Sequence, residues 1–331
     1  MKSLDVCGLG NGLLDIFLEI SEPEFSQLGF ERGTMRLVES AEQRDLLRRF
    51  GDRSPLMASG GSVANSIIAV SQLGGRSGFI GSFGNDEYGA FYRREFEDLG
   101  IRLNRAESTP VDTGTVVALI TPDGERTMRT HLGAAALLTP EHVDRDLIEA
   151  ASWLFPEGYL FANPVNGQPT IRRSIEHARS HGTKIAITCS EAFVVEAFGD
   201  ALGSALEHAD LVFANEAEAL ALAGTQNVDE AFERLGARFP AVVVTRGSAG
   251  AMVNYEGVVG RVPAFACTPR DLTGAGDMFA GAFLYGVTHG VAPLEAARGA
   301  CYLAMHVVSR VGARLHHGAR SLWEDCLAGR V

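Results

Sequence analysis

The chain has 331 residues, which is enough for about two domains of roughly 150 residues or for one large domain with an appendage. Hydrophobic residues make up 46% of the sequence and charged residues 21%, a composition typical of soluble globular proteins and too apolar for a disordered one. The net charge of −12 argues against a general nucleic-acid-binding protein, whose surface would be basic, and against adsorption on an acidic membrane.

Short apolar runs alternate with amphipathic stretches along most of the chain. The runs predict strands at residues 4–9, 77–80, 115–120, 153–155, 184–188, 211–213 and 241–245. The amphipathic stretches predict helices at residues 64–73, 90–99, 168–180 and 228–239, and two mostly apolar helices are expected at 278–288 and 293–309. Buried strands that alternate with helices are typical of a mostly parallel sheet covered on both faces, so we expect an α/β fold.

Two segments, residues 12–36 and 107–132, fit this alternation badly because they are richer in charge and in turn residues. They contain short alternating pieces at residues 15–20, 113–120 and 126–131, with a turn signal at 121–125. We interpret them as hairpins that form a small β-sheet lid. The large domain is then expected to comprise residues 1–11, 37–106 and 133–331.

The cysteines are widely spaced, odd in number and without a Cys-x-x-Cys pair. This pattern favours buried reduced thiols over a disulfide framework or a structural metal site. The first residues lack the long apolar core of a signal peptide, and no apolar run approaches the roughly 18 residues of a membrane span, so we expect a cytoplasmic protein. The cysteines are Cys7, Cys189, Cys267, Cys301 and Cys326.

The motif Asp-Leu-Thr-Gly-Ala-Gly-Asp, residues 271–277, precedes the first of the two apolar helices. The small residues Gly274, Ala275 and Gly276 leave the backbone N–H groups at a helix N-terminus unobstructed, which makes an anion hole. Asp277 follows in the first helical turn. Its carboxylate either caps the helix or accepts a proton from a hydroxyl that attacks phosphorus held in the hole.

This motif resembles the C-terminal signature of the ribokinase (PfkB) family of carbohydrate and nucleoside kinases, which usually has Thr where Leu272 stands. Residues 58–75 resemble the N-terminal signature of the family, 213–224 its Asn-x-x-Glu motif, and 242–251 the Thr-x-Gly-x-x-Gly loop of the ATP site. The four motifs stand in the family's order. The resemblance covers nearly the whole chain, from Val6 to about Leu315.

The resemblance implies a ribokinase-like three-layer α/β/α fold and an ATP- and Mg²⁺-dependent transfer of phosphate to a primary hydroxyl. It makes Asp277 the general base and the amides of residues 274–277 the anion hole. Asn215 and Glu218 would organise Mg²⁺ through its water shell, and Asp271 and Thr273 are candidate ligands of a monovalent cation such as K⁺. The implied ATP-binding residues are Asn215, Thr245, Gly247, Gly250, Arg126 and His306.

The N-terminal segment, residues 8–21, resembles adenosine kinases, in which the positions of Asn11 and Asp15 hold the ribose hydroxyls. Phe193 aligns with an aromatic residue that stacks on adenine, and Tyr159 is a second candidate platform. Adenosine, phosphorylated on its 5′-hydroxyl, is therefore one expected substrate. The other residues expected to bind the substrate are Gly60, Gly61, Ser62, Asn65, Met128, Thr130 and Leu132.

Other interpretations stay open. Asp15 suits any polyol, and Arg129 and His131 on the lid either face solvent or contact an acidic or phosphorylated sugar. A free sugar or sugar acid (ribose, fructose or 2-keto-3-deoxygluconate) is therefore the alternative substrate. The family implies a monomer or a homodimer formed through the lid. A dinucleotide-binding Rossmann protein is disfavoured, because Leu13 stands where its fingerprint needs glycine.

A kinase homologue that only binds nucleotide is disfavoured by the intact Asp277. His177 and His181 lie four residues apart on a predicted helix, but no His-Glu-x-x-His motif accompanies them. We interpret them as part of a solvated helix face.

Overall fold

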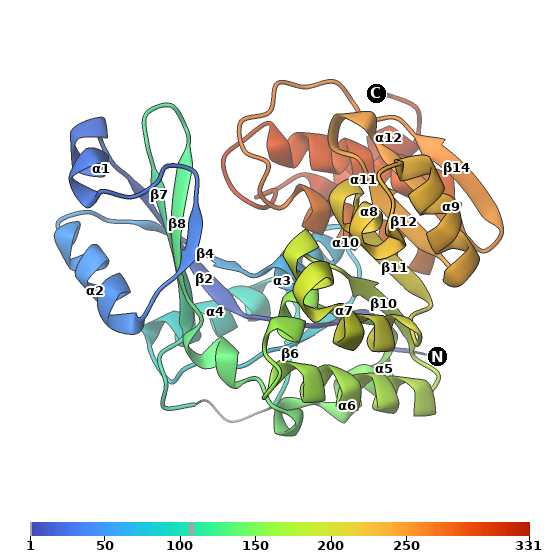
Figure 1. The fold of residues 1–331 in the computed structure, drawn as a ribbon, viewed down its shortest axis with the longest axis horizontal. Helices are drawn as coiled ribbons and strands as arrows, with labels where there is room; N and C mark the ends of the chain where they lie inside the picture. The colour runs from blue at the N-terminus through green and yellow to red at the C-terminus, as the bar shows by residue number, and fades with distance from the viewer. Residues whose placement is uncertain (1, 106–108) are drawn as a thin grey trace.

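Nine strands form the larger sheet of the computed structural model, which describes residues 2–105 and 109–331 (Figure 1). Residues 1 and 106–108, which belong to the expected segments 1–11, 37–106 and 107–132, lie outside the described residues. The strands follow the order β14-β13-β12-β11-β10-β9-β1-β5-β6 and are parallel except for β13, which is antiparallel to both of its neighbours, β12 and β14. Their bounds are β1 Leu4–Leu9, β5 Ser77–Ile80, β6 Arg102–Leu103, β9 Ala151–Pro156, β10 Lys184–Thr188, β11 Leu211–Asn215, β12 Val242–Thr245, β13 Ala251–Tyr255 and β14 Val258–Val262.

Helices cover both faces of this sheet, because successive side chains of a strand point to opposite sides. In β1, Val6 packs into one hydrophobic core and its neighbour Cys7 into another. The first core includes α3 (Ser62–Gln72), α4 (Glu87–Asp98), α10 (Ala275–Thr288), α11 (Pro293–Val308) and α12 (Ala319–Leu327). The second includes α5 (Arg145–Ala150), α6 (Gly167–Ser180), α7 (Ala192–Leu206), α8 (Glu216–Ala223) and α9 (Val228–Arg238). The expected α/β fold with three layers is confirmed.

A second, five-stranded sheet has the order β3-β8-β7-β2-β4 and stands beside the first (Figure 1). Leu14, Ile16 and Leu18 of β2 pack with the two helices of this part into a third core. The alternate residues of β2 point to the opposite face of the sheet. The bounds are β2 Leu13–Glu19, β3 Met35–Leu37, β4 Leu56–Gly60, β7 Gly114–Ile120, β8 Arg126–His131, α1 Glu22–Leu28 and α2 Ser40–Arg49.

The small sheet differs from the expected lid in two ways. Among the described strands of the small sheet, only β7 and β8 form a hairpin. Residues 12–36 instead supply α1 and β2, and β2 pairs with β7 and β4. Residues 40–60, expected in the large domain, supply α2 and β4 to the small sheet. The boundary expected at residue 37 therefore does not follow the strand pairing. Pairing between distant strands is decided by the tertiary structure, which local patterns do not reveal.

Single turns of 3₁₀ helix lie at Gly133–Leu137, Pro140–His142, Gly158–Ala162 and Gly247–Ala249. Among the described residues, no helix combines the length and the apolarity that crossing a membrane requires. All five cysteines are unpaired, but Cys267 is exposed, contrary to the expectation of buried thiols, because it lies in the irregular segment between β14 and α10.

Candidate active site

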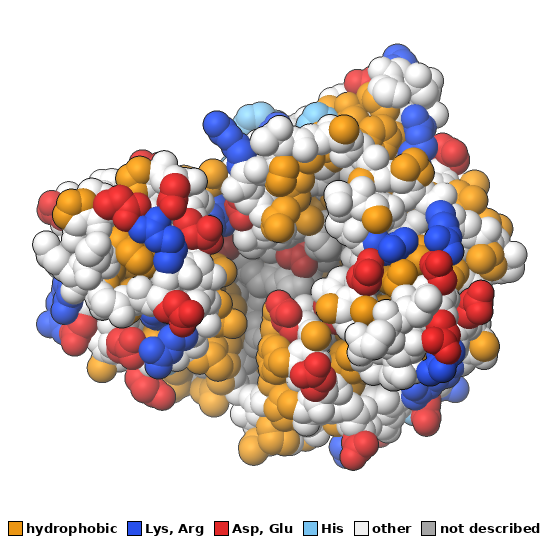
Figure 2. Space-filling model, turned by 45° about the horizontal axis from the view of Figure 1, so that its top comes forward, with side chains coloured by type: hydrophobic (Ala, Val, Ile, Leu, Met, Phe, Trp, Pro, Cys, Tyr) orange, Lys and Arg blue, Asp and Glu red, His pale blue; other side chains and the backbone are white. Residues whose placement is uncertain are grey.

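A cavity of about 690 Å³ opens between the two sheets, at the carboxyl ends of the parallel strands. Residues at or just beyond the ends of these strands line it: Asn11 two residues after β1, Glu157 directly after β9, Asn215 at the end of β11 and Thr245 at the end of β12. The carboxyl edge of a parallel sheet is where open α/β proteins bind ligands. Figure 2 shows the surface hollowed between the small lobe and the main body, with acidic atoms inside the hollow.

Asp277 lies in the first turn of α10 and on the wall of the cavity. Ser62 Oγ donates a hydrogen bond to its Oδ1 (2.7 Å), and Asn65 Nδ2 donates to its Oδ2 (3.0 Å). Burial raises the pKa of Asp277 to about 6, although these two hydrogen bonds act in the opposite direction. A carboxylate that is oriented by two donors and ionised near neutral pH suits a general base.

The N-terminus of α10, where the sequence predicts an anion hole, lies on the cavity wall. Gly274 caps the helix with a φ of 77°, and a side chain there would place its Cβ 2.0 Å from the Ala313 carbonyl oxygen. The first N–H groups of a helix have no partner within it, and the helix dipole makes this end attractive to an anion. Thr273, Gly274 and Gly276 line the cavity beside Asp277.

Two further carboxyls, those of Asp15 and Glu157, line the cavity. Burial raises the pKa of Asp15 to about 7, with Arg314 and Arg126 acting in the opposite direction. The Asp15 carboxylate fills the space beside Gly60, where a Cβ would stand 2.5 Å from Oδ2. This contact explains the glycine, although Gly60 itself is outside the cavity lining.

Glu157 is a buried residue that the sequence analysis missed. Asn11 Nδ2 donates to Glu157 Oε1 (2.7 Å), and the backbone N–H groups of Asn11 and Val63 donate to Oε2 (3.3 Å each). Burial raises the pKa of Glu157 to about 7. Its position two residues after the strand predicted at 153–155 was the available signal, because strand ends meet at one edge of a parallel sheet.

Aromatic and apolar side chains also line the cavity. Tyr159 and Phe193 lie with ring centroids 6.2 Å apart, and the side chain of Phe193 is 46% exposed. Two exposed residues of the edge strand β3, Met35 and Leu37, also line the cavity and were missed by the sequence analysis. Their strand is short and pairs only with β8 among the described strands, so no local pattern predicted it. Of the predicted substrate-binding residues, those that line the cavity are Asn11, Asp15, Gly61, Ser62, Asn65, Met128, Thr130, Leu132, Tyr159 and Phe193.

Asn215 and Glu218 lie on the cavity wall at the start of α8. The Asn215 backbone N–H and Nδ2 donate to the two Glu218 carboxylate oxygens (3.0 and 2.6 Å), and the Glu218 N–H donates to Asn215 Oδ1 (2.9 Å). Burial raises the pKa of Glu218 to about 7. Because both carboxylate oxygens already accept hydrogen bonds, this pair fits Mg²⁺ held through its water shell, as that ion prefers, better than direct coordination.

The predicted monovalent-cation ligands do not fit such an ion as they stand. Arg126 Nη2 lies 2.9 Å from Asp271 Oδ2, and both side chains are buried. The Thr273 and Gly312 backbone N–H groups also donate to the Asp271 carboxylate (3.1 and 2.8 Å). A guanidinium therefore already balances the charge of Asp271.

Several predicted site residues, most of them from the ATP site and all of them described by the structure, do not line the cavity. Arg126 lines a neighbouring cavity that shares Asp15 and Asn65 with the first, and its guanidinium lies over the Phe17 ring, 5.1 Å from the centroid. His306 is on α11, against the Tyr302 ring. The residues outside the lining are Gly60, Arg126, Gly247, Gly250, Asp271, Ala275 and His306.

The residues that suggested an acidic sugar also point elsewhere. Arg129 is 1% exposed, its guanidinium lies 3.9 Å from the centroid of the Phe30 ring, and Nη1 donates to the Met128 carbonyl (2.9 Å). His131 Nδ1 lies 3.2 Å from the Val38 carbonyl oxygen. Neither belongs to the cavity lining, so this argument for an acidic substrate is wrong.

Comparison with known proteins matches this geometry to a family. Residues 52–317 match the family described as pfkB family carbohydrate kinase. The probable sugar kinase from Rhizobium etli CFN 42 has a TM-score of 0.87 and 29% identity over 100% of both chains, and the adenosine kinase from Sinorhizobium meliloti has a TM-score of 0.85 and 30% identity over 99% of both. Adenosine kinase 1 of Arabidopsis thaliana is 25% identical over 330 residues, 92% of this chain and 94% of that protein.

These similarities span both sheets and the cavity between them, and they confirm the expected ribokinase-like fold. They also agree with the family that the four sequence motifs resemble. The chain is a kinase that belongs to the pfkB family of carbohydrate kinases.

Proposed function

We propose that this kinase transfers the γ-phosphate of ATP to the 5′-hydroxyl of adenosine or a closely related nucleoside. The observation that carries the proposal is the lining of this one cavity. It combines Asp277 and the α10 N-terminus with the aromatic and apolar side chains Tyr159, Phe193 and Leu37. A flat purine gains from aromatic contact, whereas a bare sugar does not.

In the proposed reaction, Asp277 accepts the proton of the substrate hydroxyl as its oxygen bonds to phosphorus. Ser62 and Asn65 hold the carboxylate in place through the hydrogen bonds described above. The N–H groups of residues 274–277 stabilise the charge on the transferred group. The leaving ADP keeps the electron pair of the broken O–P bond.

Asn11 and Asp15 are proposed to bind the ribose hydroxyls. Asp15 carries two acceptor oxygens, and the Asn11 side chain is fixed by its hydrogen bond to Glu157 (2.7 Å). Mg²⁺ bound through water at Asn215 and Glu218 would neutralise phosphate charge. K⁺ is not part of the proposed reaction, because the guanidinium of Arg126 already forms an ion pair with the carboxylate of Asp271.

A free sugar is the second candidate substrate. The specific observation in its favour is the similarity to the probable sugar kinase from Rhizobium etli CFN 42 over the whole of both chains. In that case Asp277 and the α10 N-terminus would act as proposed, and Tyr159, Phe193 and Leu37 would have no purine to contact.

The test measures ADP release from ATP and Mg²⁺ with adenosine, inosine, guanosine, ribose, fructose and 2-keto-3-deoxygluconate, each with and without K⁺. The Asp277→Asn variant is the control for contaminating kinases. Strong turnover of adenosine supports the nucleoside proposal. Turnover of a free sugar alone would overturn the purine site and keep the proposed base.

A further inference from the structure

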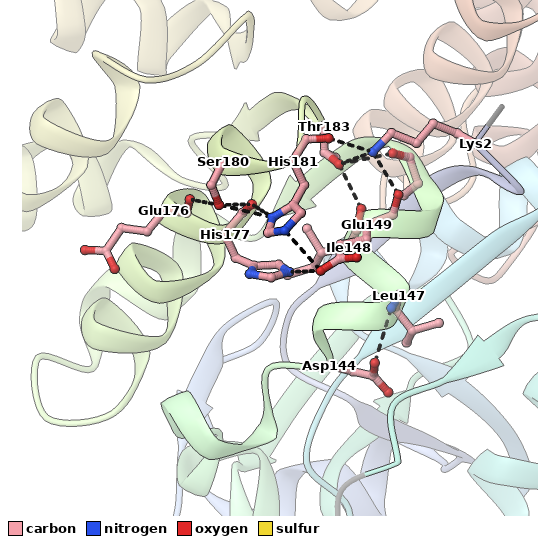
Figure 3. A network of polar contacts seen from close by, with 11 residues as sticks. Lys2, Asp144, Leu147, Ile148, Glu149, Glu176, His177, Ser180, His181 and Thr183 are labelled. Atoms are coloured by element: carbon pink, nitrogen blue, oxygen red, sulfur yellow. Dashed lines mark hydrogen bonds and ion pairs between the residues drawn. The ribbon is translucent and has the colours of Figure 1, made fainter.

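Two histidines and a glutamate converge on the outer surface of the large domain, away from the proposed active site (Figure 3). His177 lies in the last turn of α6, His181 directly follows that helix, and Glu149 lies near the end of α5. Glu149 Oε1 is 3.0 Å from His177 Nε2 and 3.3 Å from His181 Nε2. The spacing of the histidines predicted only a solvated helix face. In the structure both histidines contact the carboxylate of Glu149, which the sequence analysis did not pair with them.

The contacts of His181 favour a hydrogen on one of its two ring nitrogens. Nδ1 lies 3.0 Å from the His177 carbonyl oxygen and 3.1 Å from Ser180 Oγ, and a hydrogen on Nδ1 satisfies the carbonyl oxygen, which only accepts. The neutral ring then turns the Nε2 lone pair toward the carboxylate of Glu149. A cation between these two atoms stabilises that arrangement, and a backbone carbonyl on the other ring nitrogen is the usual support of a metal-bound histidine.

The distances fit a small first-row ion. A tetrahedral Zn²⁺ with bonds of about 2.0–2.1 Å to nitrogen and oxygen separates its ligand atoms by about 3.3 Å. The two measured separations to Glu149 Oε1 are 3.0 and 3.3 Å, and the three ligand atoms all lie within 4.8 Å of one another. Two histidines and one carboxylate are also a common ligand set for Zn²⁺.

The backbone that carries the ligands is held in place. Lys2 Nζ donates to the carbonyl oxygens of Glu149 (2.8 Å) and His181 (3.2 Å) and to Thr183 Oγ1 (2.9 Å). Thr183 Oγ1 in turn donates to the Ile148 carbonyl (2.9 Å). The ends of α5 and α6 are thereby tied together, so the ligands need little ordering when an ion binds.

The site is also open to solvent. The side chains of His181 and Glu149 are 42% and 44% exposed, whereas that of His177 is 11% exposed. An ion can enter without any opening of the fold, and a water molecule can complete its coordination.

We propose that Glu149, His177 and His181 bind Zn²⁺ or a chemically similar first-row divalent ion, with water in the fourth position. Among residues 2–105 and 109–331, this is the one group of three or more histidine, cysteine and acidic side chains whose ligand atoms all lie within 4.8 Å of one another. It lies at the amino ends of β9 and β10, the opposite edge of the sheet from the cavity. An ion bound there therefore links α5 to α6 and raises the stability of the folded chain, and it takes no part in phosphate transfer.

The test is calorimetric titration of the metal-free full chain with Zn²⁺, together with its melting temperature with and without Zn²⁺. We expect one bound ion per chain and a raised melting temperature, because the ion binds only the folded arrangement. Mg²⁺ should not compete, since it prefers oxygen ligands. Co²⁺ should bind in the same place and show the visible absorption of a four-coordinate site.

The variants His177→Ala and Glu149→Gln should each weaken Zn²⁺ binding by more than about tenfold, the lower end of the loss seen when even a supporting group is removed. The matched control is Glu176→Gln, on the same helix but turned away from the site in Figure 3, which should bind like the wild type. Cys267→Ser removes the exposed thiol as a competing ligand and should also leave binding unchanged. Absence of binding to the wild type, or equal binding by His177→Ala, would overturn the proposal.

Discussion

At the scale of single residues, the proposed chemistry depends on side chains whose charges are tuned by burial. Asp277 is buried among Ser62, Asn65 and the start of α10, so its proton affinity is higher than that of a solvated aspartate. The two hydrogen bonds orient its oxygens and keep the pKa from rising further. The carboxylate of Asp277 is therefore both held in a fixed orientation and ionised in the neutral pH range.

The Asp277→Asn substitution tests the proposed base. The amide is similar in shape but cannot accept the proton, so kcat should fall by about 10²–10⁴-fold while the melting temperature changes little. Steady-state ADP release and a thermal melt measure the two effects. A variant that keeps more than a tenth of the wild-type kcat would contradict the role of base.

The pH dependence of the wild type tests the same residue. Because burial raises the pKa of Asp277 to about 6, kcat/KM should fall about tenfold per unit as the pH drops below that value. An ordinary aspartate would keep its activity to about pH 4. A pH profile measured with saturating ATP and Mg²⁺ distinguishes the two cases.

Phe193→Ala tests the proposed contact with the purine. Loss of one stacking aromatic costs about 1–3 kcal/mol, so KM for adenosine should rise about 5- to 150-fold with kcat nearly unchanged. Val165→Ala is the matched control, because Val165 is also an exposed hydrophobic residue but is outside the cavity lining. An unchanged KM in Phe193→Ala would argue for a substrate without a base.

At the scale of elements, α10 carries the proposed chemistry because of how it begins. The Gly274 cap in the left-handed region begins the helix at the cavity, so that Gly274, Gly276 and Asp277 line it. On the other side of the cavity, the pleat of β2 separates a buried face, with Leu14 and Ile16, from a face with Leu13 and Asp15 that lines the cavity. A one-residue shift in the register of β2 would exchange the two faces.

Gly274→Ala should destabilise the protein by at least about 1–2 kcal/mol, because a left-handed alanine is strained and its Cβ would meet the Ala313 carbonyl oxygen. Gly276→Ala is the control for stability, since nothing lies within 4 Å of a Cβ at that position. Denaturant unfolding of both variants measures the difference. Equal loss of stability in the two would contradict the structural argument for the cap.

At the scale of the whole molecule, the cavity between the two sheets gathers carboxyls with raised pKa values. Asp15, Glu157 and Glu218 each have a pKa of about 7, and Asp277 has one of about 6. Burial makes their ionisation costly in the folded chain and not in the unfolded one. The molecule thus gives up stability at neutral pH to keep a charged binding cavity.

The raised pKa values of these carboxyls predict that the stability of the folded chain depends on pH. Between the unfolded pKa values near 4 and the folded values near 7, the folded state binds more protons than the unfolded state. The free energy of unfolding therefore falls as the pH rises through this range. Melting temperatures between pH 5 and 7.5 should decrease in the wild type without ligands and decrease less in Glu157→Gln, which lacks one of these carboxyls. An identical slope in the variant would contradict the raised pKa of Glu157.

Much of this protein followed from its sequence. Periodic apolar runs predicted the central strands closely, since β1, β5 and β10 have the expected bounds, because a buried strand needs a short unbroken apolar run whatever surrounds it. The motif at residues 271–277 predicted the start of α10 and the position of Asp277, because helix caps are local structures. The resemblance to the PfkB family predicted the fold, and the comparisons confirm it.

Only the tertiary structure decided which distant residues meet. It joined Glu157 to Asn11, paired Arg126 with Asp271, moved β4 and α2 to the small sheet and brought Glu149 beside the two histidines of α6. None of these contacts is visible in a local pattern, because each depends on how elements far apart in the chain pack. Local periodicity determines what an element is, and the packing of the whole chain determines what its side chains contact.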